Sequence, residues 1–380
     1  MTDQTMIHRP NPTDGPSVPA ENARLHAPTS APDGSSPAVG RGARVGVDIG
    51  GSKIAVLVVG ADGEPCARRR SALESPDPDP AIAQIAAVID ASLSDAGLSR
   101  ADVQAVGVGV PGRVDTRAGS VTFAVNLGWQ QVPLGAHLEV VLGLPVVVEN
   151  DVRAAAVGLH RRSAVGSADD LAYLSIGTGI SAGVILGGRL HRGVRGVAGE
   201  VGHVVLDAHG PACACGLHGC FEALAAGPAI ARAAREAVAA GRSTNLARIA
   251  DPSAVDVFAA AAEGDEVALG IVADVGRWVA RGVHALVLAY DVELVVIGGG
   301  VSRAGEPFLR AIEAGLAATR AASPFADELL GGTAVRLLPE DVEPGTWGAV
   351  ALVENTSRRV AGPARGRTTV EEVVARETEA

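Results

Sequence analysis

The chain has 380 residues, 47% of them hydrophobic, which is enough to bury a sizeable core and favours two domains. Aromatic residues make up only 3%, so that core must be built mainly from Ala, Val, Leu and Ile. The formal net charge of −11 argues against a general affinity for nucleic acid or for an anionic membrane surface. Four cysteines offer no disulfide framework and fit a reducing cytoplasm.

The N-terminal segment predicts no folded element. Residues 1–42 carry seven prolines and many Ser, Gly and Asp, a composition typical of a disordered tail. The first thirty residues lack the apolar stretch of a secretory signal. A later run, Leu171–Gly188, has no charge over eighteen residues, but its five glycines favour strand–turn–strand over a membrane span. We therefore expect a cytoplasmic protein that does not cross a membrane.

The first predicted elements are two strands joined by a glycine turn. Apolar runs over 45–47 and 54–59 flank Asp48–Lys53, and a third strand is expected over 64–71. Glycines let the backbone approach a ligand, and exposed N–H groups beside a hydroxyl and an ammonium suit phosphate. Lys53 is the only lysine, the other 31 basic residues being arginines. The alternative is an ordinary hairpin with a solvated lysine.

The following segment alternates helices and strands up to an Asn-Asp pair. In chain order we expect a helix over 81–96, a buried strand over 103–110, a strand over 121–124, a helix over 133–142, a strand over 145–149 and a helix from 152 to about 161. Asp151 therefore follows a strand end, where open α/β sheets present ligands. The other interpretation of Asp151 is an N-cap for the helix that follows.

The second half opens like the first. A strand over 171–176, the turn Gly177–Gly179 and a strand over 183–186 form another glycine hairpin. After it we expect helices over 228–240 and 267–289, a strand over 292–297 ending on Gly298–Gly300, and helices over 306–322 and 346–357. Two halves that begin alike predict a duplicated α/β architecture, with a cleft between them that suits a nucleotide and a second substrate.

A compact cluster of thiols lies between Gly199 and Glu222. Three of the four cysteines are Cys213, Cys215 and Cys220, with His203 ten residues upstream. One imidazole and three thiolates are the donors of a closed tetrahedral zinc site. Glu200 and Glu222 bracket the cluster, which predicts that a metal there shapes a polar site. Buried structural cysteines without metal are the alternative.

Taken together, the motifs resemble the ROK family of sugar kinases and sugar-responsive repressors, within the actin-like ATPase superfamily. The resemblance runs from about Val45 to Val353 and is carried by residues 48–53, 110–112, 126–129, 149–151, 177–180, 196–203, 213–222 and 297–302. It implies an α/β, duplicated actin-like ATPase (ribonuclease H-like) fold of two domains with the active-site cleft between them. The implied parts are a tail over 1–42, a small domain over 43–152 plus about 346–361, a large domain over 153–345 and a tail over 362–380.

The resemblance also implies roles for individual residues. Asp151 would be the general base, and the hexose hydroxyls would be held by Asn126, Asn150, Asp151, Glu200, His203 and Glu222. The zinc ligands would be His203, Cys213, Cys215 and Cys220. The two phosphate loops and the turn near the adenosine would be formed by Gly50, Gly51, Ser52, Lys53, Gly177, Thr178, Gly179, Gly298, Gly299 and Gly300. The implied cofactors are ATP, Mg²⁺ and a structural Zn²⁺.

The expected reaction is ATP-dependent phosphorylation of a hexose at its 6-hydroxyl, with glucose as the first candidate. N-acetylmannosamine, N-acetylglucosamine or fructose could replace glucose, and polyphosphate could replace ATP. A sugar-sensing repressor is disfavoured, because the 42 Pro-rich residues before Ala43 contain no recognition helix. We expect a hexose as partner, no nucleic acid, and a homodimer or homotetramer. Two departures from the family pattern are Ser181-Ala182 in place of a glycine pair and Arg153 in place of a common Asn.

Overall fold

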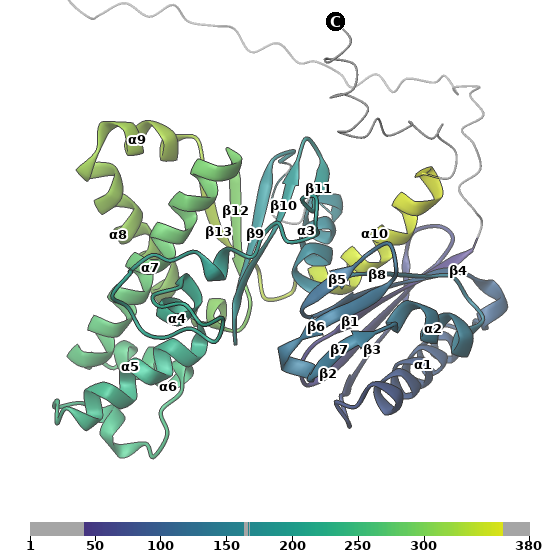
Figure 1. The fold of residues 1–380 in the computed structure, drawn as a ribbon, viewed down its shortest axis with the longest axis horizontal. Helices are drawn as coiled ribbons and strands as arrows, with labels where there is room; N and C mark the ends of the chain where they lie inside the picture. The colour runs from purple at the N-terminus through teal and green to yellow at the C-terminus, as the bar shows by residue number, and fades with distance from the viewer. Residues whose placement is uncertain (1–41, 163–165, 167, 360–380) are drawn as a thin grey trace, which may run out of the picture. The chain divides into compact units, whose positions relative to one another are not determined.

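The computed structural model describes residues 42–162, 166 and 168–359, so the predicted tails lie outside the described residues except for Gly42. The first sheet has the strand order β3-β2-β1-β4-β8 (Figure 1). Its strands are β1 (Ala43–Ile49), β2 (Lys53–Val59), β3 (Pro65–Ala72), β4 (Val103–Val110) and β8 (Val146–Asn150). The first three strands pair antiparallel, whereas β1, β4 and β8 run parallel. The carboxyl ends of β1, β4 and β8 therefore lie at the same edge of the sheet.

The second sheet repeats this topology, with the order β11-β10-β9-β12-β13. Its strands are β9 (Leu171–Ile176), β10 (Ile180–Leu186), β11 (Arg189–His191), β12 (Leu294–Gly298) and β13 (Ala334–Leu337). Again a three-stranded antiparallel meander is extended by two parallel strands. The predicted duplication is confirmed, and the uncharged run over 171–188 forms β9 and β10. Among the described residues, no helix has the length and apolar character that crossing a membrane would need.

A small third sheet follows β4. It consists of β5 (Arg113–Asp115), β6 (Ser120–Ala124) and β7 (Trp129–Val132), in that order. Only β6 is predicted from the sequence. The other two strands are three and four residues long, too short for an alternating pattern to be visible.

Helices cover both large sheets (Figure 1). In chain order they are α1 (Pro78–Asp95), α2 (Leu134–Leu142), α3 (Asp151–Arg162), α4 (Phe221–Ala225), α5 (Gly227–Ala239), α6 (Ala254–Ala262), α7 (Glu266–Tyr290), α8 (Glu306–Ala322), α9 (Pro324–Gly331) and α10 (Pro344–Arg359). In α1, Ile82, Ile85 and Ile89 are buried at helical spacing and join the core formed with the first sheet. Successive side chains of β9 pack into different cores. Leu174 packs with α5 to α8, and Tyr173 packs with α3.

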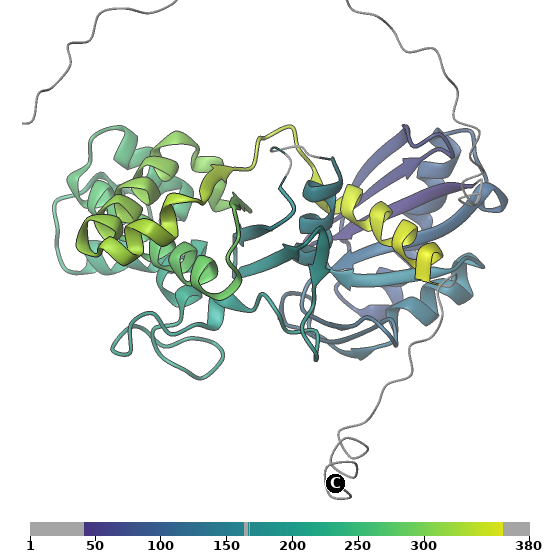
Figure 2. The same ribbon diagram turned by 90° about the horizontal axis from the view of Figure 1, so that it is seen from above.

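The last helix, α10, packs against β1, β4 and α3 (Figure 2). Glycines make this contact possible. A Cβ atom on Gly107 of β4 would lie 1.8 Å from the carbonyl oxygen of Ala349, and one on Gly348 would lie 1.7 Å from that of Ala154. Both separations are far below van der Waals contact. The backbone of α10 therefore packs directly against the backbones of β4 and α3. The predicted helix over 346–357 is thus confirmed, and it begins two residues earlier at Pro344.

Candidate active site

Two carboxylates meet where the parallel strands of the first sheet end. Asp48 lies near the end of β1, and Asp151 begins α3 directly after β8. Between these strands, β4 carries Gly109, where a Cβ atom would lie 3.4 Å from the Cα of Asp151 and 3.7 Å from Oδ1 of Asp48. The absent side chain leaves room for both carboxylates at one edge.

Their surroundings make both carboxylates hard to ionise. Burial raises the pKa of Asp48 to about 6, although the nearby charges of Lys53 and Arg70 oppose the shift. Burial likewise raises the pKa of Asp151 to about 7, and the charge of Asp48 adds to it. Desolvation and like charge act in the same direction on such a pair. Asp151 therefore titrates near neutral pH, as a general base does.

The hydrogen bonds of Asp151 fix one of its oxygens. Oδ1 accepts from the backbone N–H of Val152 and from Nδ2 of Asn150, each at 2.9 Å. Both bonds are to Oδ1, and neither engages Oδ2. Because these bonds to the first turn of α3 use Oδ1, the N-cap interpretation of Asp151 is compatible with the general-base interpretation.

Asn150 holds this arrangement in place. Its Nδ2 also donates to the carbonyl oxygen of Gly112 at 3.1 Å, and its Oδ1 accepts from the N–H of Arg153 at 3.0 Å. Both ends of the amide are therefore engaged by protein groups. This geometry points to Asn150 as an orienting residue for Asp151, in addition to the sugar contact that the family resemblance implies.

The first glycine turn lies beside the predicted sugar ligand Asn126. The turn is closed by the N–H of Gly50, which donates to the carbonyl oxygen of Lys53 at 2.8 Å. Gly51, Ser52 and Lys53 are exposed. A Cβ atom on Gly51 would lie 3.5 Å from the Cβ of Asn126, which is itself exposed in the 3-10 helix η2 (Val125–Leu127).

The second glycine turn, Gly177–Gly179, lies beside Gly298–Gly300. The N–H of Gly177 donates to the carbonyl oxygen of Gly179 at 2.9 Å, and a Cβ atom on Gly177 would lie 3.6 Å from the nitrogen of Gly300. Thr178 is exposed between the two glycines. Gly299 has φ of 88° and no room for a side chain, because a Cβ atom would lie 2.4 Å from the carbonyl oxygen of Ile176. The second phosphate-loop candidate and the adenosine-side candidate are therefore neighbours.

Tyr173 is a residue near this site that the sequence does not single out. Its hydroxyl lies 2.5 Å from where a Cβ atom on Gly298 would be. Burial raises the pKa of Tyr173, and the charges of Asp48 and Asp151 raise it further. The phenol is thus neutral at physiological pH. An aromatic residue in an apolar strand is typical of an ordinary core, so no sequence signal marks Tyr173. Asp48 differs, because it lies in the recognised motif over 48–53, but the sequence alone assigns it no role.

The predicted metal ligands come together in space. The donor atoms of His203, Cys213, Cys215 and Cys220 all lie within 4.8 Å of one another. Sγ of Cys215 is 3.6 Å from Sγ of Cys220, and Sγ of Cys213 is 3.8 Å from Nδ1 of His203. Four ligands around a tetrahedral ion with Zn–S near 2.3 Å are about 3.5–3.8 Å apart. The four side chains therefore have a spacing that could hold such an ion.

The two glutamates near this cluster differ in their surroundings. Glu222 lies on α4, two residues after Cys220, and its Oε2 accepts the N–H of Ile180 at 2.9 Å. Glu200 is exposed, and its carbonyl oxygen accepts the N–H of His203 at 3.2 Å. Because Nδ1 of His203 faces the thiols, Nε2 is the nitrogen available to a ligand. Glu222 thus joins the thiol cluster to the second glycine turn.

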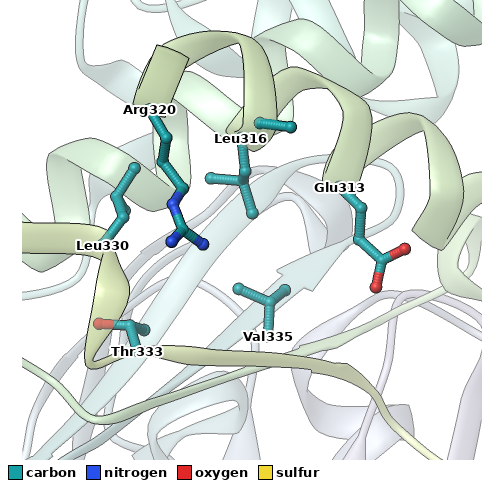
Figure 3. A pocket seen from close by; sticks show the side chains of 7 residues that line it. Glu313, Leu316, Arg320, Leu330, Thr333 and Val335 are labelled. Atoms are coloured by element: carbon teal, nitrogen blue, oxygen red, sulfur yellow. The ribbon is translucent and has the colours of Figure 1, made fainter. Parts of the chain in front are cut away.

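A cavity of about 390 Å³ lies elsewhere, between α8, α9 and β13 (Figure 3). Its lining residues, none of them a predicted site residue, are Glu313, Leu316, Ala317, Arg320, Leu330, Thr333 and Val335. Arg320 is engaged by Asp327 at 2.6 Å. The cavity therefore contributes no group to the chemistry described above.

Comparisons with known proteins agree with this architecture. A glucokinase of Halalkalibacterium halodurans is 36% identical over 275 residues, covering 71% of this chain and 83% of that protein. An N-acetylmannosamine kinase of Escherichia coli is 35% identical over 280 residues, covering 73% of this chain and 89% of that protein. The crystal structure of a ROK family glucokinase from Streptomyces griseus in complex with glucose and AMPPNP matches with a TM-score of 0.63 and 35% identity, over 82% of this chain and 99% of that one. The ROK family model matches residues 44–356, and the chain belongs to the ROK family.

Proposed function

We propose that this protein is an ATP-dependent sugar kinase that transfers a phosphoryl group to the 6-hydroxyl of glucose. The observation that carries the proposal is the pair of half-buried carboxylates, Asp48 and Asp151, which meet beside Gly109 at the ends of the parallel strands. Phosphoryl transfer requires positioning, charge neutralisation and a carboxylate beside the attacking hydroxyl. Glucokinases of 35–36% identity among the relatives support glucose as the acceptor.

In this proposal Asp151 is the general base. Oδ2 accepts the proton of the 6-hydroxyl while Oδ1 stays bonded to Val152 and Asn150, so the carboxylate keeps its orientation during proton transfer. The pKa of about 7, raised by burial and by Asp48, makes Asp151 a stronger base than an exposed aspartate and leaves it largely ionised at slightly alkaline pH. Both properties favour proton abstraction near physiological pH.

In this proposal the two glycine turns bind the nucleotide. Exposed N–H groups of Gly51 and Ser52, with the ammonium of Lys53, suit the phosphates of ATP, and Gly177–Gly179 supplies the second loop. The Streptomyces griseus relative was crystallised with the ATP analogue AMPPNP, which supports ATP as donor. The residues also fit Mg²⁺: Asp48 would hold the ion, which would neutralise charge on the transferred phosphoryl group.

The hydroxyls of the sugar are held by amide, carboxylate and imidazole groups, which suit them: those of Asn126, Asn150, Asp151, Glu200, His203 and Glu222. We further propose that His203, Cys213, Cys215 and Cys220 hold one structural Zn²⁺. Four protein ligands close the coordination sphere, so the ion would hold the loop that bears the sugar ligands and would leave no open position for water.

A coupled ATP-consumption assay tests the proposal. Wild-type protein would be measured with glucose, N-acetylmannosamine, N-acetylglucosamine and fructose, and with polyphosphate in place of ATP. The highest kcat/KM is expected for glucose with ATP. A preference for an acetamido sugar or for polyphosphate would correct the substrate, and absence of turnover with every pair would overturn the proposed function.

A further inference from the structure

A buried carboxylate with two arginine partners lies next to the active site and has no role in the chemistry above. Glu149 is fully buried at the end of β8, one residue before Asn150. Its Oε1 accepts from Nε of Arg153 at 2.9 Å, and its Oε2 accepts from Nε of Arg192 at 2.5 Å. One carboxylate therefore joins α3 to the segment that follows β11.

Arg153 extends this link to the loop of residues 192–203. Its Nη1 donates to the carbonyl oxygen of Gly196 at 2.5 Å, while Nη2 is buried without a partner among the described residues. The loop then runs to Glu200 and His203, two of the proposed sugar ligands. The loop is also fixed to β10, because the carbonyl oxygen of Gly199 accepts the N–H of Ala182 at 2.8 Å.

Arg153 is not explained by the local stability of α3. It is the third residue of the helix, where a positive charge opposes the helix dipole. A buried guanidinium also has a desolvation cost, which the pairing with Glu149 and Gly196 offsets only in part because Nη2 lacks a partner. The side chain therefore stabilises a tertiary arrangement, the loop against the β8–α3 junction.

We propose that Glu149, Arg153 and Arg192 form a positioning network that fixes loop 192–203 relative to Asp151. The network sets Glu200 and His203 to hold the sugar while Asp151 meets the reacting hydroxyl, so it acts on sugar binding through other residues. This inference rests on the proposed function for its catalytic readout.

Arg192→Gln and Arg153→Lys test the network. Arg192→Gln removes the bond to Glu149 from a side chain that is one-third exposed, and Arg153→Lys keeps the charge but loses the fork that bridges Glu149 and Gly196. We expect each variant to raise KM for glucose at least tenfold, with KM for ATP within about twofold. The double variant should be less than additive, because both arginines act through the same carboxylate.

Arg44→Gln is the matched control. Arg44 is also a buried arginine that bonds a carboxylate, Glu354, and a carbonyl oxygen, that of Gly60, but it lies at the start of β1. This control should lower the melting temperature without changing KM for glucose. If Arg192→Gln and Arg153→Lys behave like Arg44→Gln, the arginines are merely structural and the positioning role is overturned.

Amide hydrogen exchange gives a readout that does not need activity. Exchange in the peptide covering 192–203 should rise in Arg192→Gln and stay at the wild-type level in Arg44→Gln. Unchanged exchange there would overturn the network even in a protein that phosphorylates glucose. If the wild type turns over no sugar but exchange rises as expected, the proposed function fails while the tethering of the loop stands.

Discussion

The carboxylate of Glu222 accepts a 2.9 Å hydrogen bond from the backbone N–H of Ile180, the first residue of β10. Gly179 precedes Ile180, and a Cβ atom on Gly179 would lie 2.5 Å from Oε2 of Glu222. The helix that follows Cys220 is therefore in direct contact with the second glycine turn. A change in the thiol cluster is therefore expected to affect the proposed nucleotide loop as well as the proposed sugar ligands.

The first prediction concerns the metal. Purified protein should contain about one Zn²⁺ per chain, and Cys215→Ser should lower the melting temperature by several degrees and raise KM for both glucose and ATP. Cys66→Ser is the control, because Cys66 is the exposed cysteine outside the cluster. Metal analysis and thermal unfolding of both variants are the measurements. Zinc-free wild-type protein, or two variants that behave alike, would contradict the site.

The second prediction concerns catalysis by Asp151. Asp151→Asn keeps the shape and the acceptor for Val152 but removes the proton acceptor, so kcat should fall roughly a hundred- to ten-thousand-fold. Glucose affinity, measured by calorimetry, should stay within a few-fold. More than roughly a tenth of wild-type kcat would mean that positioning, without a general base, carries the reaction.

The third prediction follows from the raised pKa of Asp151, about 7 against 3.8 for an ordinary aspartate. A carboxyl whose folded pKa is raised favours the folded state below the unfolded pKa, and this contribution is lost as pH rises through the folded pKa. Asn cannot ionise, so Asp151→Asn should melt several degrees above the ligand-free wild type at pH 8. The difference in melting temperature should close as pH falls toward about 4. Calorimetric scans from pH 8 to pH 4 measure it, and a variant that melts below the wild type at pH 8 would contradict the raised pKa.

The fourth prediction assigns Lys53 to the nucleotide. Lys53→Ala should raise KM for ATP at least tenfold or lower kcat, with KM for glucose within about twofold, because Lys53 begins β2 directly after the glycine turn and its side chain lies beside Gly50. Arg69→Ala on the adjacent strand β3 is a suitable control, since Arg69 is paired with Asp95. Steady-state kinetics with each substrate varied in turn distinguish the outcomes, and a selective loss of sugar binding would reject the assignment.

Local signals in the sequence were sufficient for both glycine hairpins and for the long helices, because turn residues and apolar periodicity act over a few positions. Strand β7 is not predicted from the sequence, because Gln130 and Gln131 interrupt any apolar run. Gln131 also has a positive φ of 51°, which is unusual in a strand. Helix α6 could have been found, because Ser253 and Asp256 form a capping box at its start.

The chemical core of the site is harder to derive from sequence. Asp48 and Asp151 become neighbours only through the parallel pairing of β1, β4 and β8. Neither segment alone indicates which distant strand it pairs with. The same is true of the pair Glu149 and Arg192, which are separated by 43 positions. The zinc-ligand candidates can be predicted from the sequence, because three of the four lie within eight residues. The domain boundaries at 152/153 and 345/346 stay predictions.

The contact of α10 with the first sheet has a consequence for biosynthesis. One face of that sheet packs on α1, but the other, with Leu57 and Val59, is completed by Val350 and Trp347, which belong to the last described helix. A ribosome has therefore released nearly the whole polypeptide before the earliest strands can be covered. Until then this apolar surface is open to other nascent chains, so we expect truncation before Pro344 to yield aggregates that a chaperone holds rather than a free N-terminal half.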